Sequence, residues 1–208
     1  MKVVAINGSP RINGNTAAAF SVMKSVFESH GIEMDIINVG SDDIHGCIGC
    51  ESCVGKGRCV FDNDIVNVSI DKMRAADGII LGSPVYFSGV AGTMKSFLDR
   101  AFFVATRERE FRGKVGAALV SARRSGGSAA LDCLNHYIVY SEMTLVGSSY
   151  WPIIHGWGAG EAVKDTEGMD TVKMLAENMA WVLMQRNAMN DKLPYPDMEK
   201  RRKLNFVR

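Results

Sequence analysis

Residues 2–16 read KVVAINGSPRINGNT, and the chain continues AAAFSVMKSVFESH to position 30. Lys2–Ile6 has the β-branched, apolar character of a short strand. Between Thr16 and His30 the apolar residues recur at helical spacing, and Gly31 ends that pattern. A strand, a glycine-containing turn and a helix in this order predict the opening unit of an α/β protein.

The alternation of strand and helix continues along the chain. Further apolar strands are expected at Met34–Val39, Gly78–Leu81, Val115–Val120 and Thr144–Val146. Further helices are expected at Asp62–Arg74, Ala91–Ala105, from a capping Ser128 to about Ser141, and at Met169–Arg186. Five buried strands alternating with helices predict a doubly wound parallel sheet with helices on both faces. Ligands of such sheets lie beyond the carboxyl ends of the strands, where the glycine-rich turns of this chain fall.

The length and composition of the chain favour a single domain, and its net charge does not indicate a nucleic acid or a membrane as partner. The chain has 208 residues, 47% of them hydrophobic, and a net charge of +1. We expect a single domain over residues 1–188, including a cysteine loop at 45–60, and a basic C-terminal extension over 189–208. Near-neutral charge gives no reason to expect nucleic acid or a membrane as partner. The short apolar N-terminus predicts no signal peptide, so a cytoplasmic location is expected.

Four cysteines lie within thirteen residues, in the spacing Cys47-x2-Cys50-x2-Cys53-x5-Cys59. In a reducing compartment such a cluster indicates metal ligands or redox groups rather than disulfides. Thiolates this close meet around one centre when the backbone curls, as in iron–sulfur proteins. Zinc sites usually pair two C-x2-C units, whereas the first three thiols here are evenly spaced. An iron–sulfur cluster, a zinc ion and free thiols remain three alternatives for this loop.

The turn Gly8–Thr16 has the chemistry of a phosphate site. It has no lysine after its second glycine and does not fit G-x-G-x-x-G, so neither a nucleoside triphosphate loop nor a dinucleotide fingerprint is indicated. It offers backbone N–H groups at a helix start, the hydroxyls of Ser9 and Thr16, and the charge of Arg11. The sequence predicts a seat for one terminal phosphate, with an ordinary strand-to-helix turn as the alternative.

A second loop, Ser83–Gly89, follows a buried strand and contains Pro84, Tyr86 and Phe87. An aromatic pair at a strand end can line one side of a flat heteroaromatic ring. Such a pair is also common in protein cores. Its place at the same sheet edge as the phosphate turn favours the ring-binding interpretation.

Together these segments resemble the flavodoxin-like NAD(P)H-dependent FMN reductases and, within them, the iron–sulfur flavoproteins. The similar elements span roughly residues 1–150: Gly8-Ser9-Pro10-Arg11 with Gly14-Asn15-Thr16, the cysteine run closing in Cys59-x2-Asp62, Ala75-Ala76-Asp77-Gly78-Ile79-Ile80, Gly82-Ser83-Pro84-Val85-Tyr86-Phe87, Lys95-Ser96-Phe97-Leu98-Asp99-Arg100, and Gly126-Gly127.

The resemblance implies FMN held by three loops in a sheet of order 2-1-3-4-5. Its phosphate would be bound by Ser9, Arg11, Asn15 and Thr16, its ring by Pro84, Val85, Tyr86 and Phe87, and the other ring edge by Ala122, Arg123, Gly126 and Gly127. A 4Fe-4S cluster would be bound by Cys47, Cys50, Cys53 and Cys59. One departure is the pair Arg123-Arg124, where small residues are expected. We hypothesise that these cations raise the potential of the flavin.

The resemblance also implies electron transfer between NAD(P)H, FMN and the cluster, without a catalytic side-chain acid or base. Homodimers or homotetramers are usual in such a family, and a ferredoxin-type carrier is an alternative electron donor. Two other functions remain open. One is an FMN-dependent quinone or nitro-compound reductase without a cluster, and the other is a non-catalytic flavodoxin-like or zinc-stapled binding module.

Overall fold

A computed structural model of the chain describes residues 1–196, so most of the basic extension expected over 189–208 lies outside the described residues. The strands are β1 (Lys2–Asn7), β2 (Glu33–Asn38), β3 (Gly78–Tyr86), β4 (Gly89–Val90), β5 (Val115–Ala122), β6 (Thr144–Leu145) and β7 (Ile153–His155). The helices are α1 (Asn15–Ser29), α2 (Val66–Ala75), α3 (Gly92–Arg107), α4 (Gly127–Tyr140), α5 (Thr166–Met189) and a short 3-10 helix, η1 (Glu161–Lys164).

Five strands follow the order β2-β1-β3-β5-β6 in the sheet, and neighbours along this path are parallel. The doubly wound fold is therefore confirmed, and its five main strands follow the expected order once β4 is set aside. Two short strands were not expected. β4 folds back antiparallel on the end of β3, and β7 lies parallel to the end of β5. The predicted fifth strand, Thr144–Val146, corresponds to β6, and the unpredicted β7 lies further along the same edge of β5.

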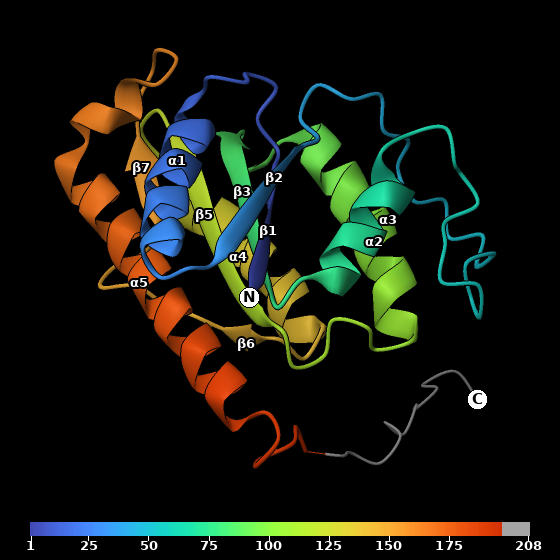
Figure 1. The fold of residues 1–208 in the computed structure, drawn as a ribbon. Coiled ribbons are helices and arrows are strands. Elements are labelled where there is room, and N and C mark those ends of the chain that lie inside the picture. The colour runs from blue at the N-terminus through green and yellow to red at the C-terminus, as the bar shows by residue number, and fades with distance from the viewer. Residues whose placement is uncertain (197–208) are drawn as a thin grey trace, which may run out of the picture.

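Helices cover both faces of the sheet (Figure 1). Alternate residues of β1 pack into the apolar cores on opposite faces of the sheet. Val4 and Ile6 pack with α2, α3 and α4, whereas Val3 and Ala5 pack with α1 and α5. Because both faces are buried, the central strands are apolar without interruption.

Several predicted boundaries differ from the structure, and the clearest cases are these. The second predicted helix begins at Val66 rather than Asp62. The Asn67 side chain instead bonds the backbone of Cys59 at both N and O. β3 continues past Leu81 to Tyr86 because its end pairs with β4. Ser128 does not cap α4, since the helix begins one residue earlier and Gly126 is its cap residue.

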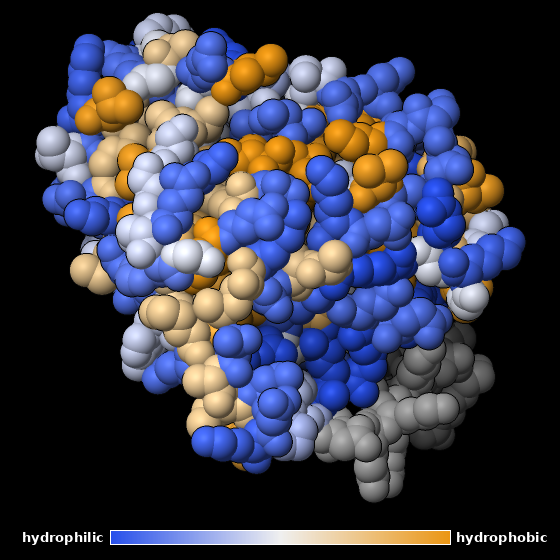
Figure 2. Space-filling view, in the orientation of Figure 1, coloured by the Kyte–Doolittle hydropathy of each residue, from blue (hydrophilic) through white to orange (hydrophobic). Residues whose placement is uncertain are grey.

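Over the described part of the chain, no helix is long and apolar enough to cross a membrane. In the space-filling view, the most strongly apolar exposed side chains lie in the upper half of the molecule (Figure 2). The strands β1 and β3 point toward that end in Figure 1. It is the carboxyl edge of the sheet, where ligands of doubly wound proteins bind.

Candidate functional site

The phosphate turn closes on itself at the carboxyl end of β1. The buried Ser9 accepts the Arg11 N–H on its Oγ at 3.2 Å, and the Gly14 N–H donates to the Arg11 carbonyl at 3.0 Å. Gly14 precedes α1, and no side chain caps that helix. The amides of the first helical turn therefore keep their anion-binding capacity.

Asn15 and Thr16 also bind neighbouring segments. Asn15 Oδ1 accepts the Ala162 N–H at 2.9 Å, which attaches η1 to the turn. The Thr16 hydroxyl is fully buried and lies 3.0 Å from the hydroxyl of Ser121, at the end of β5. Of the four predicted phosphate residues, Arg11 is the exposed cation, and its guanidinium reaches the carbonyl of Trp157 at 3.5 Å.

The second loop is a tight hairpin between β3 and β4. Its two turn residues, Phe87 and Ser88, have positive φ angles of 49° and 61°. This geometry matches the two-residue turns that join antiparallel strands, although glycine or asparagine usually occupies such positions. The Phe87 side chain is completely exposed, with a relative accessibility of 108%. Phe87 is therefore not a core residue, which was the alternative to ring binding.

The third loop contacts the second. Gly126 has a φ of 85°, and a Cβ atom there would lie 2.8 Å from Ser88 Cα. A glycine is required for this close approach. Ala122 is buried at the end of β5, and Gly127 starts α4. The structure thus brings all three predicted loops to one edge of the sheet.

Trp157 was missed by sequence reasoning. Its exposed ring lies under the guanidinium of Arg123, 4.3 Å from the ring centroid, and its carbonyl meets Arg11. It therefore connects the first loop to the third. Ser121 was missed as well, although its place at the end of a buried strand was a usable signal. Trp157 follows β7, whose existence the sequence pattern did not reveal.

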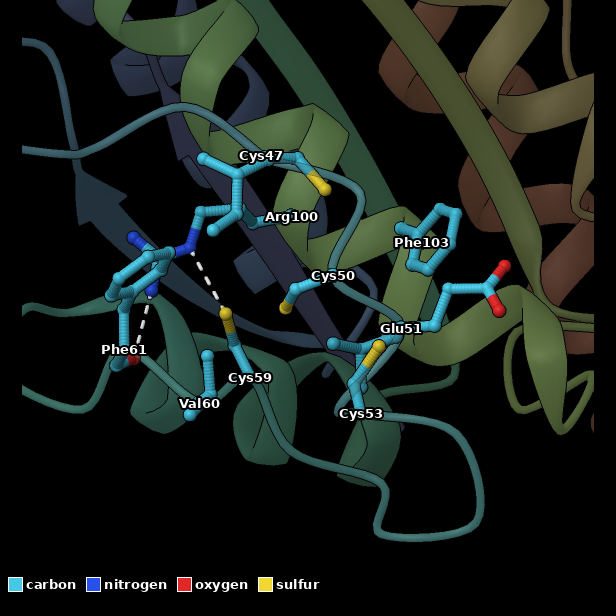
Figure 3. A pocket seen from close by; sticks show the side chains of 11 residues that line it. Cys47, Cys50, Glu51, Cys53, Cys59, Val60, Phe61, Arg100 and Phe103 are labelled. Atoms are coloured by element: carbon cyan, nitrogen blue, oxygen red, sulfur yellow. Dashed lines mark hydrogen bonds between the residues drawn. The ribbon is translucent and has the colours of Figure 1, made fainter.

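The four cysteines of the loop line one small cavity of about 20 Å³ against α3 (Figure 3). Cys47 and Cys50 are exposed and Cys53 is buried. Burial raises the pKa of the Cys53 thiol, and the other three thiols add to that effect. Hydrogen bonds from Ser52 lower the pKa of Cys50. In residues 1–196, no three Cys, His, Asp or Glu side chains are arranged to hold a single metal ion.

Arg100 of α3 lies behind this cavity and is only 1% exposed. Its Nε donates to Cys59 Sγ at 3.3 Å, and one Nη donates to the Phe61 carbonyl at 2.8 Å. It also forms an ion pair with the buried carboxylate of Asp64. Neither Arg100 nor Asp64 was predicted as a site residue from its own properties. Arg100 and Asp64 are 36 residues apart in the sequence, so their pairing could not be predicted from the local pattern of apolar residues.

The fold and the gathered loops define a flavodoxin-like protein. A WrbA-like flavodoxin of Agrobacterium tumefaciens superposes with a TM-score of 0.60 at 18% identity, covering 88% of this chain and 97% of that one. RosB, solved with bound 8-demethyl-8-formylriboflavin-5′-phosphate, superposes with a TM-score of 0.73 at 14% identity, covering 100% and 94% of the two chains. At these identities the likeness establishes the fold.

Sequence comparison gives the family. Residues 1–158 match the family model of the NADPH-dependent FMN reductases, and the chain belongs to that family. An iron–sulfur flavoprotein of Methanocaldococcus jannaschii is 35% identical over 191 residues, which cover 88% of this chain and 97% of the relative. The predicted family is confirmed, and the protein is a flavoprotein oxidoreductase of the FMN reductase type.

Proposed function

We propose that this protein binds FMN at the carboxyl edge of its sheet and a 4Fe-4S cluster on Cys47, Cys50, Cys53 and Cys59. In this function it passes electrons between NAD(P)H, or a reduced ferredoxin-type carrier, and these two centres. The observation that carries the proposal is that all four thiols line one cavity, in a fold whose three ligand loops meet at one edge.

For FMN, the residues present fit the cofactor. The uncapped start of α1 and the side chains of Ser9, Arg11, Asn15 and Thr16 would receive the phosphate. Backbone and side chains of Pro84, Val85, Tyr86 and Phe87 would border one side of the ring, and Ala122, Arg123, Gly126 and Gly127 would border the other edge. When bound, FMN supplies hydride acceptance and the onward transfer of electrons singly or in pairs.

The protein's own groups in this site position the cofactor and set its electrostatics. Gly126 lets the second and third loops approach, because no Cβ separates them. Arg123 and Arg124 place positive charge at the third loop, and such charge stabilises negative charge on a neighbouring ring. No side chain needs to move a proton for this chemistry, in agreement with the absence of a predicted catalytic residue.

For the cysteine cavity we propose a cluster rather than a zinc ion. A zinc ion needs its sulfur ligands about 2.3 Å from one point. The irons of a 4Fe-4S cluster each take one thiolate, so the thiolates surround a space instead of meeting at a point. The four thiols border one common cavity, and this shared lining supports the cluster proposal.

The second candidate function is an FMN-dependent quinone or nitro-compound reductase whose cysteines remain free thiols. The exposure of Cys47 and Cys50 supports it, since exposed thiols can react without a metal. In either function we propose a cytoplasmic homodimer or homotetramer. The fully exposed Phe87 ring at the site edge supports a neighbouring subunit there.

A purification without oxygen tests the proposal. The visible spectrum, iron, zinc and acid-labile sulfide would be measured on one sample after FMN and iron–sulfide reconstitution. Flavin bands with about four irons and four sulfides per chain would support both centres. Flavin without iron would leave the reductase with free thiols. A protein that refuses added FMN would contradict the proposal entirely.

A further inference from the structure

Arg100 is a buried cation whose polar contacts all go to the cysteine loop and the segment after it. It projects from α3 with 1% exposure. One Nη donates to the His45 carbonyl at 3.3 Å, ahead of the first cysteine, and the other donates to the Phe61 carbonyl at 2.8 Å, behind the last one. One side chain therefore holds both ends of the loop on the helix.

Arg100 makes a further contact, to the sulfur of a cysteine in the loop. Arg100 Nε donates to Cys59 Sγ at 3.3 Å, and Figure 3 shows this bond at the side of the cavity. A hydrogen bond from a guanidinium is charge-assisted and stronger than a neutral one. The other arginine of α3 beside the loop, Arg107, lies over the Phe103 ring and pairs with Glu51. It thus contacts the loop through a carboxylate, in contrast to the Arg100 contact to sulfur.

Asp64 limits the charge that Arg100 brings. Its side chain is 6% exposed and pairs with the Arg100 guanidinium. It also accepts the Val66 N–H at 3.0 Å, which fixes the carboxylate at the start of α2. Cys59 therefore accepts a hydrogen bond from a cation that is also paired with a buried carboxylate.

We propose that Arg100 is a positioning residue that raises the reduction potential of the cluster through its Nε–H···Sγ bond to Cys59, and that Asp64 moderates this effect. The inference rests on the proposed function, in which Cys59 is a cluster ligand. Reduction adds one electron to the cluster and increases its negative charge. A donor on a ligand sulfur stabilises the reduced form more than the oxidised form, which raises the potential.

The test compares two substitutions with opposite expected signs. Arg100→Lys keeps a positive charge near Asp64 but removes the Nε–H donor, so the midpoint potential of the cluster should fall. Asp64→Asn keeps the shape and removes the opposing charge, so the midpoint should rise. A residue with a purely structural role would not produce shifts of opposite sign. Arg107→Lys is the matched control on the same helix and should leave the midpoint unchanged.

Midpoints would be measured by spectroelectrochemical titration of the reconstituted protein, with the bound FMN as internal reference and iron and sulfide analysis of each variant. The FMN midpoint should remain constant while the cluster midpoint shifts. An unchanged cluster midpoint in a fully loaded Arg100→Lys protein would overturn the inference. If that variant loses iron, Asp64→Asn decides: a raised midpoint supports the role, and an unchanged or lowered one overturns it. Wild-type protein that binds FMN but no iron would instead refute the cluster proposal before any variant is compared.

Discussion

Phe87 combines an unfavourable backbone conformation with complete exposure of its ring. Its φ of 49° lies in the left-handed region, where a side chain with a Cβ is strained. Its side chain has no burial to offset that strain. Strain retained at the edge of a ligand site indicates a functional role for the side chain.

We therefore expect Phe87→Asn to stabilise the fold and weaken the function. Asparagine tolerates this conformation better, so the free energy of unfolding should rise by about 1 kcal/mol in urea titrations. FMN affinity or turnover with NADPH should fall. The control is Tyr140→Asn, an exposed aromatic residue at the last position of α4, which should give no gain in stability. A variant of Phe87 that is both less stable and fully active would refute this assignment.

Arg123 and Arg124 allow a second test at the level of single residues. Replacing both by glutamine should lower the midpoint potential of bound FMN, because positive charge near the ring stabilises its reduced, anionic form. The potential would be measured by dye-equilibrated reduction. Arg58→Gln, in the cysteine loop and paired with Asp62, serves as the control. Equal FMN midpoints in wild type and the double variant would refute the hypothesis.

At the scale of elements, the second and third loops meet where Gly126 lies against Ser88. Gly126→Ala should cost about 1–3 kcal/mol of unfolding free energy, from the left-handed backbone and the clash with Ser88. It should also weaken FMN binding, measured by flavin fluorescence. Gly31→Ala is a matched control, because Gly31 has a φ of +68° with no atom within 4 Å of a built Cβ. Equal costs for the two substitutions would mean that the contact with Ser88 contributes nothing.

Asp165 joins β7 to the start of α5. Its carboxylate accepts the N–H of Gly168 at 3.0 Å and that of His155 at 2.7 Å. Burial alone would raise the pKa of Asp165, but these donors stabilise the charged form and bring the pKa below its ordinary value. The stabilisation is therefore present above the unfolded pKa of about 3.9 and is lost as pH falls through the lower folded pKa.

Asp165→Ala should therefore cost about 1 kcal/mol near neutral pH, as loss of a helix cap does. The difference between wild type and variant should shrink as the pH falls below the ordinary carboxyl pKa and disappear in strong acid, as urea titrations from pH 7 down through the lowered folded pKa would show. The exposed Asp170, one turn further along the same helix, provides the comparison, and its replacement by alanine should change stability by less than about 0.5 kcal/mol. A cost in strong acid, below the folded pKa, as large as at pH 7 would contradict the assigned linkage.

Helices were predictable to the extent that one face of each had a clear period, and the central strands because they are continuous apolar runs. The Thr16–His30 pattern located α1 to within a residue of its observed start and end. The start of α2 at Val66 was not predictable, because the contact of the Asn67 side chain with the backbone of the cysteine loop leaves no period in the sequence. β7 has three residues, too few for a period to be seen.

At the scale of the whole molecule, the sequence indicated which turns share an edge but not which side chains touch there. The Thr16–Ser121 contact joins residues 105 positions apart, and the Arg100–Cys59 contact joins residues 41 apart. Such pairs depend on how strands and helices pack, and no local pattern encodes them. The meeting of the three loops at the carboxyl edge of the sheet was predictable, because it follows from the parallel order of the strands alone.

Most of the cysteine loop lies beside α3, outside the two apolar cores on either face of the sheet, whereas Cys53 and the partly buried Cys59 pack with one of them. We therefore expect the two proposed cofactors to be separable. The double variant Cys47→Ser and Cys50→Ser, at the two exposed thiols, should lose iron but keep FMN and its stability to within about 0.5 kcal/mol. Iron analysis, flavin content and urea unfolding would measure this. Cys133→Ser is the control and should keep its iron, whereas loss of FMN with the iron would mean that the two sites depend on each other.

The edge of the sheet beside β5 is formed by two separate short strands, β6 and β7, and this has a consequence for solubility. A continuous edge strand offers a row of free backbone groups to which a strand of another molecule can add. Here β6 pairs with Val115 and Gly116, and β7 pairs with Val120 to Ala122, so this border of the sheet consists of two short pieces. An incoming strand would find no long, flat partner. The interrupted border should therefore hinder edge-to-edge aggregation in a molecule whose sheet is otherwise strongly apolar.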